Sequence, residues 1–278
     1  MKAVNSNTTE HFINTSFGNL GLFRGLYTVQ NFRPHFHECY TIIFVDKGVG
    51  DYSTSKSNFI MAKDTVLILN PYEVHTGKSV NNKPWSFLTL YIPVDIMKKA
   101  DAQNENALLT PFFKENKIHD KELFKMGLAI FPYLVEQSDF EATESALMGF
   151  LQNLLNKYSH DFVEETDLSK RFIIAKKIHD YIHESYDDEV SLSLLSEELH
   201  INTYNLIKIF KEYYDLPPHQ YLVNLKIEKA KILLLENKSC TEVAYLSGFF
   251  DQSHFIRHFK KIVGITPKRY AAVTTGEK

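Results

Sequence analysis

One ten-residue helical pattern occurs twice in this chain, 49 residues apart. Residues 202–211 read Asn-Thr-Tyr-Asn-Leu-Ile-Lys-Ile-Phe-Lys, and residues 251–260 read Asp-Gln-Ser-His-Phe-Ile-Arg-His-Phe-Lys. The same offset continues in two further pairs: Pro218 with Pro267, and Tyr221 with Tyr270. Composition alone does not maintain a register over so many positions. The C-terminal part therefore contains two copies of one supersecondary unit.

Each copy predicts a helix with one inward face. The first residue of each copy, Asn202 or Asp251, is of a type that caps helix N-termini. Apolar residues follow at the fourth and eighth positions after each cap and form a stripe facing a core: Leu206 and Phe210, then Phe255 and Phe259. The positions between them face outward: Tyr204, Asn205, Ile207 and Lys208, then Ser253, His254, Ile256 and Arg257.

A short amphipathic segment precedes each copy, at residues 191–199 and 239–247. Ser239 and Glu242 have the spacing of a capping box, and Gly248 stands where a tight turn needs positive φ. Helix, tight turn and helix with a polar outer face is the helix-turn-helix arrangement, whose second helix enters the DNA major groove.

The segment between the copies, residues 218–236, is predicted to be one helix. At about 1.5 Å per residue it spans roughly 28 Å, which is close to the ~34 Å turn of B-DNA. Two recognition helices held by it could therefore enter successive major grooves on one face of a duplex.

These features resemble the AraC/XylS family of transcription regulators. The resemblance rests on residues 227–234 (Ile-Glu-Lys-Ala-Lys-Ile-Leu-Leu), on Val243-Ala244 with Gly248-Phe249, and on Thr266-Pro267 with Tyr270. It implies an all-α domain with two helix-turn-helix motifs. The resemblance implies that Tyr204, Ile207, Lys208, Ser253, His254 and Arg257 face base edges. The other predicted DNA-binding residues of the two helices are Asn202, Thr203, Asn205, Lys211, Gln252 and Lys260.

Two residues depart from the family pattern. Ile207 occupies a position that is usually polar, which indicates a thymine-methyl contact or weak base reading by the first helix. Asp215 stands where the family usually has Gly, and Asp tolerates the left-handed conformation less well.

Charge is distributed unevenly along the chain. The whole chain has a net charge of −3, whereas residues 170–270 carry 15 Lys and Arg against 13 Asp and Glu. DNA affinity would then rest on a few placed cations: Lys208, Lys211, Arg257, Lys260 and Lys261. Dimerisation would strengthen such binding.

The N-terminal part alternates between apolar and polar residues, as strands do. The predicted strands are residues 20–29, 40–46, 58–62, 65–69 and 86–92. Short strands joined by hairpin turns indicate a small antiparallel barrel or jelly roll.

This part resembles the cupin-like effector domain of many AraC-type regulators. The resemblance rests on residues 33–37 with Tyr40, Gly48 with Gly50, residues 70–75, and Trp85 with Tyr91. The resemblance implies Arg33, Tyr40, Phe87 and Thr89 as effector-binding residues, and we add His35, His37 and His75 as hydrogen-bonding candidates. Aromatic faces beside Arg and His suit a small polar effector such as a sugar or an amino acid.

His35, His37 and His75 could serve any of three purposes. Cupin enzymes hold a metal with two His, a Glu and a third His, but the Glu position here is Ile42. Three imidazoles could suffice for zinc, although iron redox chemistry would lack its carboxylate. The histidines could instead hydrogen-bond to a polar effector, or to the domain's own backbone. We assign these residues to the effector and predict no metal, cofactor or catalytic residue.

Two helices are predicted after the strands. Residues 121–136 contain Pro132, which should kink or end the helix. Residues 141–158 carry one apolar stripe, which would ordinarily pack on its own domain. The family resemblance nevertheless implies a dimer contact here, so the predicted dimerisation residues are Leu147, Phe150, Leu151, Leu154, Leu155 and Tyr158.

The predicted fold is α+β with two domains. Residues 1–160 form a cupin-like effector-binding and dimerisation domain, 161–169 a linker, and 170–278 the DNA-binding domain. The apolar runs are shorter than a membrane span requires, and the N-terminus has no signal-peptide core. The two cysteines, Cys39 and Cys240, fall in different domains and fit a reducing cytoplasm.

We therefore expect a cytoplasmic, homodimeric, ligand-responsive transcription regulator. Its expected partners are double-stranded DNA, a small polar effector and, if it is an activator, RNA polymerase; no membrane partner is expected. Two rival functions are a metal-dependent cupin enzyme fused to a DNA-binding domain and a constitutive regulator whose barrel only dimerises. The sequence contains no Ser-His-Asp order, P-loop or dinucleotide fingerprint that would indicate another catalytic class.

Overall fold

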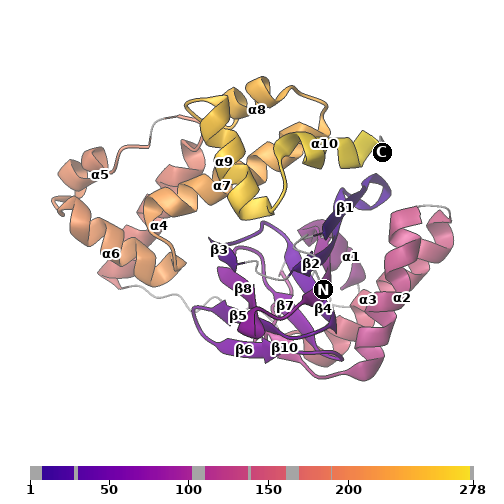
Figure 1. The fold of residues 1–278 in the computed structure, drawn as a ribbon. Helices are drawn as coiled ribbons and strands as arrows, with labels where there is room; N and C mark the ends of the chain where they lie inside the picture. Colours follow the sequence, from indigo (N-terminus) through magenta and orange to yellow (C-terminus); the bar gives the residue numbers. More distant parts are fainter. Residues whose placement is uncertain are drawn as a thin grey trace. The chain divides into compact units, whose positions relative to one another are not determined.

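The computed structural model describes residues 8–27, 31–101, 110–136, 139–160, 169–188 and 190–275. The chain divides into two compact units, with the main boundary between residues 163 and 164, and residues 32–35 are grouped with the second unit. The first is the β-rich unit and the second is the helical unit (Figure 1). Among the described residues, none of the helices combines the length and apolar character needed to cross a bilayer.

The β-rich unit contains two antiparallel sheets. Their strands are β1 (Thr8–Asn14), β2 (Leu20–Tyr27), β3 (Asn31–His35), β4 (Tyr40–Lys47), β5 (Gly50–Thr54), β6 (Asn58–Met61), β7 (Val66–Leu69), β8 (His75–Ser79), β9 (Trp85–Ile92) and β10 (Lys117–Ile118). The larger sheet has the order β1-β2-β9-β4-β7-β10 and the smaller one β3-β8-β5-β6. The strands do not close into one barrel, so the jelly-roll form of the prediction is the one that agrees with the structure.

The five predicted strands correspond to β2, β4, β6, β7 and β9, with ends shifted by one or two residues. Val29, the predicted end of the first, lies outside the described residues. Alternation did not reveal β1, β3, β5, β8 or β10. β8, for example, reads His-Thr-Gly-Lys-Ser and carries no large apolar side chain that could mark a buried face.

Three helices cover one face of the larger sheet: α1 (Val94–Ala100), α2 (Lys121–Glu136) and α3 (Phe140–Tyr158). Alternate residues of β4 face them, and the ring of Phe44 lies 6.0 Å from Phe124 of α2 and 6.0 Å from Phe150 of α3. α2 continues through Pro132 to Glu136, so this proline does not end the helix.

The apolar stripe of α3 belongs to this core. The five aliphatic and aromatic residues assigned to a dimer contact are at most 3% exposed: Leu147, Phe150, Leu151, Leu154 and Leu155. The hydroxyl of the sixth, Tyr158, donates to Asp120 Oδ2 at 3.0 Å within the same unit. Side chains that fill a domain's own core have no surface to offer a partner, so their assignment to a dimer interface is corrected.

The helical unit contains α4 (Lys170–Glu184), α5 (Leu192–Leu199), α6 (Thr203–Tyr214), α7 (Pro218–Leu235), α8 (Cys240–Leu246), α9 (Gln252–Val263) and α10 (Pro267–Thr275). α7 contacts α4 and α6 as well as α8, α9 and α10 (Figure 1). Residues 221–228 of α7 are all buried, and a helix buried on consecutive positions is enclosed on every side. At about 1.5 Å per residue, α7 spans roughly 27 Å.

Candidate DNA-reading helices and effector site

α6 and α9 begin with the same capping geometry. Asn202 Oδ1 accepts a hydrogen bond from the backbone N–H of Asn205 at 2.9 Å. Asp251 Oδ1 accepts the equivalent bond from His254 at 2.7 Å. Each bond satisfies one of the amides left free at a helix N-terminus. The two predicted caps are confirmed.

The same two helices end alike. Asp215 after α6 has φ 62° and ψ −15°, and Gly264 after α9 has φ 89° and ψ −15°. Pro218 and Pro267 then open α7 and α10. Asp215 is therefore held in the left-handed region that its Gly counterpart adopts more readily.

The repeat extends to tertiary packing. Tyr221 of α7 meets Phe210 of α6 edge to face, with ring centroids 5.4 Å apart and an interplanar angle of 87°. Tyr270 of α10 meets Phe259 of α9 at 5.5 Å and 74°. One aromatic pair of each copy thus fixes the recognition helix against the helix that follows it.

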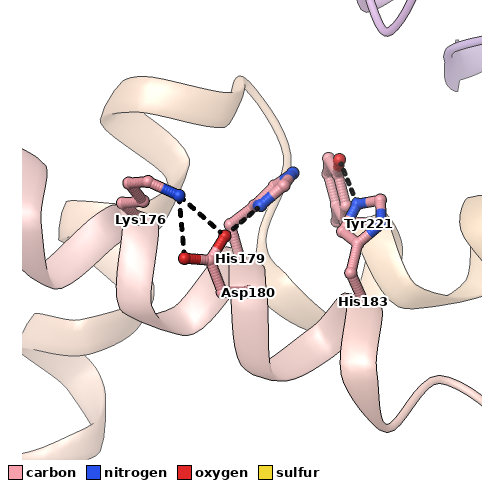
Figure 2. Close-up of polar contacts among 5 residues, drawn as sticks. All are labelled: Lys176, His179, Asp180, His183 and Tyr221. Atoms are coloured by element: carbon pink, nitrogen blue, oxygen red, sulfur yellow. Dashed lines mark hydrogen bonds and ion pairs between the residues drawn. The ribbon is translucent and has the colours of Figure 1, made fainter.

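Tyr221 also joins α7 to α4 (Figure 2). Its hydroxyl and His183 Nε2 form a 3.1 Å hydrogen bond. One turn earlier, His179 Nδ1 lies 3.1 Å from Asp180, which also pairs with Lys176 at 2.8 Å. Burial lowers the pKa of His179 despite the opposing effect of Asp180.

The two tight turns differ by one residue. In the first, His200 takes positive φ (52°) and only Ile201 separates it from the N-cap. In the second, Gly248 takes positive φ (72°), and Phe249 and Phe250 precede the N-cap. A Cβ at Gly248 would lie 2.7 Å from the backbone of Asp187. This turn therefore requires glycine.

The extra residue leaves one aromatic side chain in solvent. Phe249 is 7% exposed and its ring lies 5.3 Å from Phe255. A hydrophobic staple ordinarily pairs this fourth helical residue with the residue directly before the N-cap, but here Phe249, two residues before the cap, makes the contact. Phe250 is 96% exposed, beside α8 with Tyr245 (81%) and Leu246 (42%). The sequence analysis did not single out Phe250. The signal that could have revealed it is the pair of successive aromatic residues, Phe249 and Phe250, of which only one can be buried in the core.

The predicted DNA-binding residues lie on the outer faces of α6 and α9. Thr203 and His254 are half-buried, and the others are exposed: Asn202, Tyr204, Asn205, Ile207, Lys208, Lys211, Gln252, Ser253, Arg257 and Lys260. The inward residues Leu206, Phe210, Phe255 and Phe259 are 0% exposed.

Burial, with smaller effects from His254 and nearby cations, lowers the pKa of His258 to about 4.

The predicted effector residues lie on two faces of the larger sheet. Phe87 and Thr89 pair with Val45 and Ile43, and their side chains point away from α2 and α3. Tyr40 points the opposite way into the helix-covered core, where its hydroxyl donates to the carbonyl of Pro111. Tyr40 therefore does not share a site with Phe87 and Thr89. Arg33 is exposed on β3.

The face carrying Phe87 meets the smaller sheet through aromatic side chains. Trp85 lies 4.6 Å from Phe87 and 5.5 Å from Tyr52 of β5, between ring centroids. Trp85 is 0% exposed, and its indole N–H has no hydrogen-bond acceptor among the described residues. Buried donors are ordinarily satisfied, so this N–H is available to a bound molecule.

Two of the three predicted histidines, His37 and His75, lie side by side, with ring centroids 5.3 Å apart. All three, His35 included, are buried. His37 also meets Tyr91 of β9 edge to face at 4.9 Å. On β9, Tyr91 comes two residues after Thr89 and four after Phe87. Its side chain is therefore on the same face of the strand as theirs.

Comparison with known proteins assigns both units. A helix-turn-helix domain family matches residues 195–272, and the AraC-like ligand binding domain family matches residues 18–151. The chain belongs to the AraC family of transcription regulators. This AraC-family chain is accordingly a ligand-responsive, DNA-binding transcription regulator, as the sequence predicted.

Relatives of similar length support the assignment. The HTH-type transcriptional regulator YbfI of Bacillus subtilis is 26% identical over 232 residues, which cover 84% of this chain and 83% of the relative. The Msm operon regulatory protein of Streptococcus mutans is 23% identical and covers 86% of each chain. The structure of fatty acid-bound ToxT from Vibrio cholerae is 17% identical, covers 98% of each chain and has a TM-score of 0.59, which indicates a shared fold.

Proposed function

We propose that this AraC-family regulator inserts α6 and α9 into successive major grooves on one face of DNA. The observation that carries the proposal is the presence of two equivalent capped helices whose polar outer faces are exposed. The enclosed helix α7 contacts both of them. Its length of roughly 27 Å is comparable to one turn of B-DNA.

The outer faces supply two kinds of DNA contact. Arg257 can form paired hydrogen bonds to a guanine edge. Tyr204 is 75% exposed and offers both an apolar ring and a hydroxyl. Lys208, Lys211 and Lys260 suit phosphate contacts, which position a protein without reading sequence.

We assign Phe250 and Tyr245 to the edge of the same interface. The first helix of a helix-turn-helix crosses the DNA backbone, and the turn leads into the groove. A tyrosine hydroxyl can donate to phosphate, while the Phe250 ring can pack on deoxyribose or a thymine methyl. In this placement the exposed rings of Tyr245 and Phe250 would be buried against the DNA.

The effector is proposed to bind on the face of the larger sheet that carries Phe87, Thr89 and Trp85. The Trp85 N–H is a buried donor without an acceptor among the described residues, and His37 and His75 add polar nitrogens at the Tyr91 end. These groups favour a small solute with oxygen acceptors. The ToxT relative was solved with an unsaturated fatty acid, so the effectors of this fold need not be alike.

Dimerisation is proposed to use the exposed face of α3 in place of its buried stripe. Ala142, Ala146 and Gly149 are exposed on that face, and a Cβ at Gly149 would meet nothing within 4 Å. Small residues permit close helix approach. The protein is proposed to act in the cytoplasm without catalysis, and RNA polymerase is a further partner if it activates transcription.

One pair of experiments tests the regulatory function. Crosslinking followed by sequencing of bound DNA should recover discrete sites, and binding to one recovered site should be weakened by Tyr204→Ala and by Arg257→Ala. The chain contains one Trp, so Trp85 fluorescence can report a screen of sugars and amino acids directly. Absence of discrete sites would contradict the DNA-binding proposal, and a fluorescence change abolished by Thr89→Val would support the effector site.

A further inference from the structure

We propose that Lys226 of α7 sets the separation of the two recognition helices, α6 and α9. It does so by tying the tight turn of the second motif to the segment that leads into the first. Lys226 Nζ donates to the carbonyl of Gly248 at 2.5 Å, and Lys226 is only 8% exposed. Lysine is rarely buried to this extent without a partner. The inference rests on the proposed insertion of α6 and α9 into DNA, and it makes Lys226 a positioning residue that does not touch the duplex.

The contact at Gly248 joins one motif to the other. Gly248 lies between α8 and α9, which form the second motif, whereas Asp187 lies between α4 and α5, just before the first motif. A Cβ at Gly248 would be 2.7 Å from the Cα and from the carbonyl oxygen of Asp187, so the two backbones touch. Among the described residues, the other main contacts between the motifs pass through α7.

The segment before the first motif supplies negative charge to this joint. Burial lowers the pKa of Lys226, and the carboxylates of Asp187 and Asp188 oppose that change. The backbone N–H of Asp188 donates to the carbonyl of Ser185 at 3.1 Å, which holds this segment in a turn. Lys226 therefore has a carbonyl acceptor from one motif and negative charge from the other. Both attractions are stronger away from bulk water.

The apolar cores attach each motif to α7 separately. Tyr221 of α7 packs on Phe210 of α6, whereas Ile227 and Leu234 of α7 belong to a core with Phe255 of α9. Apolar packing is not directional, so each motif can rotate slightly about α7 without losing its core. A hydrogen bond weakens steeply when its geometry is lost. The Lys226 bridge therefore restrains a rotation that the two cores allow.

A restrained separation has a consequence for operator recognition. Two linked binding modules gain affinity only when their geometry lets both bind at once. A stiff joint therefore favours one spacing of the two half-sites and penalises others. Lys226→Met keeps the length and the apolar part of the side chain but removes the donor and its charge. Lys226→Arg keeps both.

Operator-spacing variants test this consequence. Fluorescence anisotropy would compare a recovered operator with one that carries an extra base pair between the half-sites. The insertion should weaken wild-type binding about tenfold and Lys226→Met binding by less than about threefold. Lys226→Arg should restore the wild-type pattern. The control is Lys238→Met, which should also behave like wild type, because Lys238 pairs with Glu236 two residues away at 2.7 Å and bridges nothing between the motifs.

A distance measurement tests the same joint without DNA. Spin labels would be placed at Lys211→Cys and Lys260→Cys, equivalent exposed positions of α6 and α9, in a full chain whose Cys39 and Cys240 are replaced by Ser. Pulsed electron resonance should give one narrow distance distribution. Adding Lys226→Met should broaden it.

A second variant covers the case in which Lys226→Met fails to fold. Asp187 and Asp188 are exposed, so changing both to Asn should leave the fold intact and should broaden the distance distribution in the same way, to a smaller extent. An unchanged distribution in the Met or the double Asn variant, or an insertion penalty for Lys226→Met equal to that of wild type, would overturn the proposal. If wild type does not bind two half-sites, the proposed DNA-binding mode fails, whereas the distance measurement still decides the role of Lys226.

Discussion

The adjacent residues Phe249 and Phe250 should separate folding from DNA binding. Phe249 is 7% exposed and packs on Phe255, so Phe249→Ala removes a core ring. Such substitutions cost about 3–5 kcal/mol of unfolding free energy. Phe250 is 96% exposed. Phe250→Ala should therefore change the unfolding free energy by less than ~0.5 kcal/mol.

The DNA-binding effect of Phe250→Ala follows from the area that the duplex would cover. If about 60 Å² of its ring becomes buried, at ~25 cal/mol per Å² the contact contributes about 1.5 kcal/mol. That amounts to a roughly tenfold increase in Kd. The assays are chemical denaturation of the full chain and fluorescence anisotropy on an operator duplex at fixed salt. Unchanged affinity for Phe250→Ala, or a large loss of its folding stability, would refute the reasoning.

Three further predictions concern the helical unit. Arg257→Ala should weaken specific DNA binding by ~1–3 kcal/mol and relax the sequence requirement at one base position, whereas Lys260→Ala should lower the salt dependence of log K by about one without changing sequence preference. Fluorescence anisotropy with a set of mutated operators measures both effects. Equal loss of sequence discrimination in the two variants would contradict these roles. Asp215→Gly should stabilise the unit by ~0.5 kcal/mol because it relieves the left-handed strain, and Gly264→Ala should destabilise it by ~1 kcal/mol, as thermal unfolding would report. In the folded protein the pKa of His258 is lowered from 6.5 to about 4, so as the pH falls the unfolded chain binds a proton at this residue before the folded chain does. The contribution of neutral His258 to the unfolding free energy is therefore intact above pH ~6.5 and is lost as the pH falls toward ~4. A His258→Gln chain whose stability falls as steeply over that range would contradict it.

The C-terminal half could be predicted closely because its information is local and present twice. Each capping residue contacts an amide three residues away, and each stripe has the helical period. The repeat also showed that Phe210 and Phe259 have equivalent neighbours. Phe250 escaped because the one-residue difference lies in the turn, before the repeated register begins.

The N-terminal half was less predictable because sheet pairing is not local. β3 and β8 are about forty residues apart in sequence, and neither alternates clearly enough to be recognised alone. The face on which Tyr40 lies depends on its register with Ile92 of β9. The stripe of α3 was read correctly as apolar, but periodicity cannot distinguish packing on one's own sheet from packing on a partner.

The proposed insertion of two recognition helices into one face of DNA is tested most directly by hydroxyl-radical footprinting on a recovered operator. The prediction is two protected segments about ten base pairs apart on the same side of the helix, with Tyr204→Ala weakening protection in one segment and Arg257→Ala in the other. A single short protected segment, or two segments on opposite sides of the duplex, would contradict it.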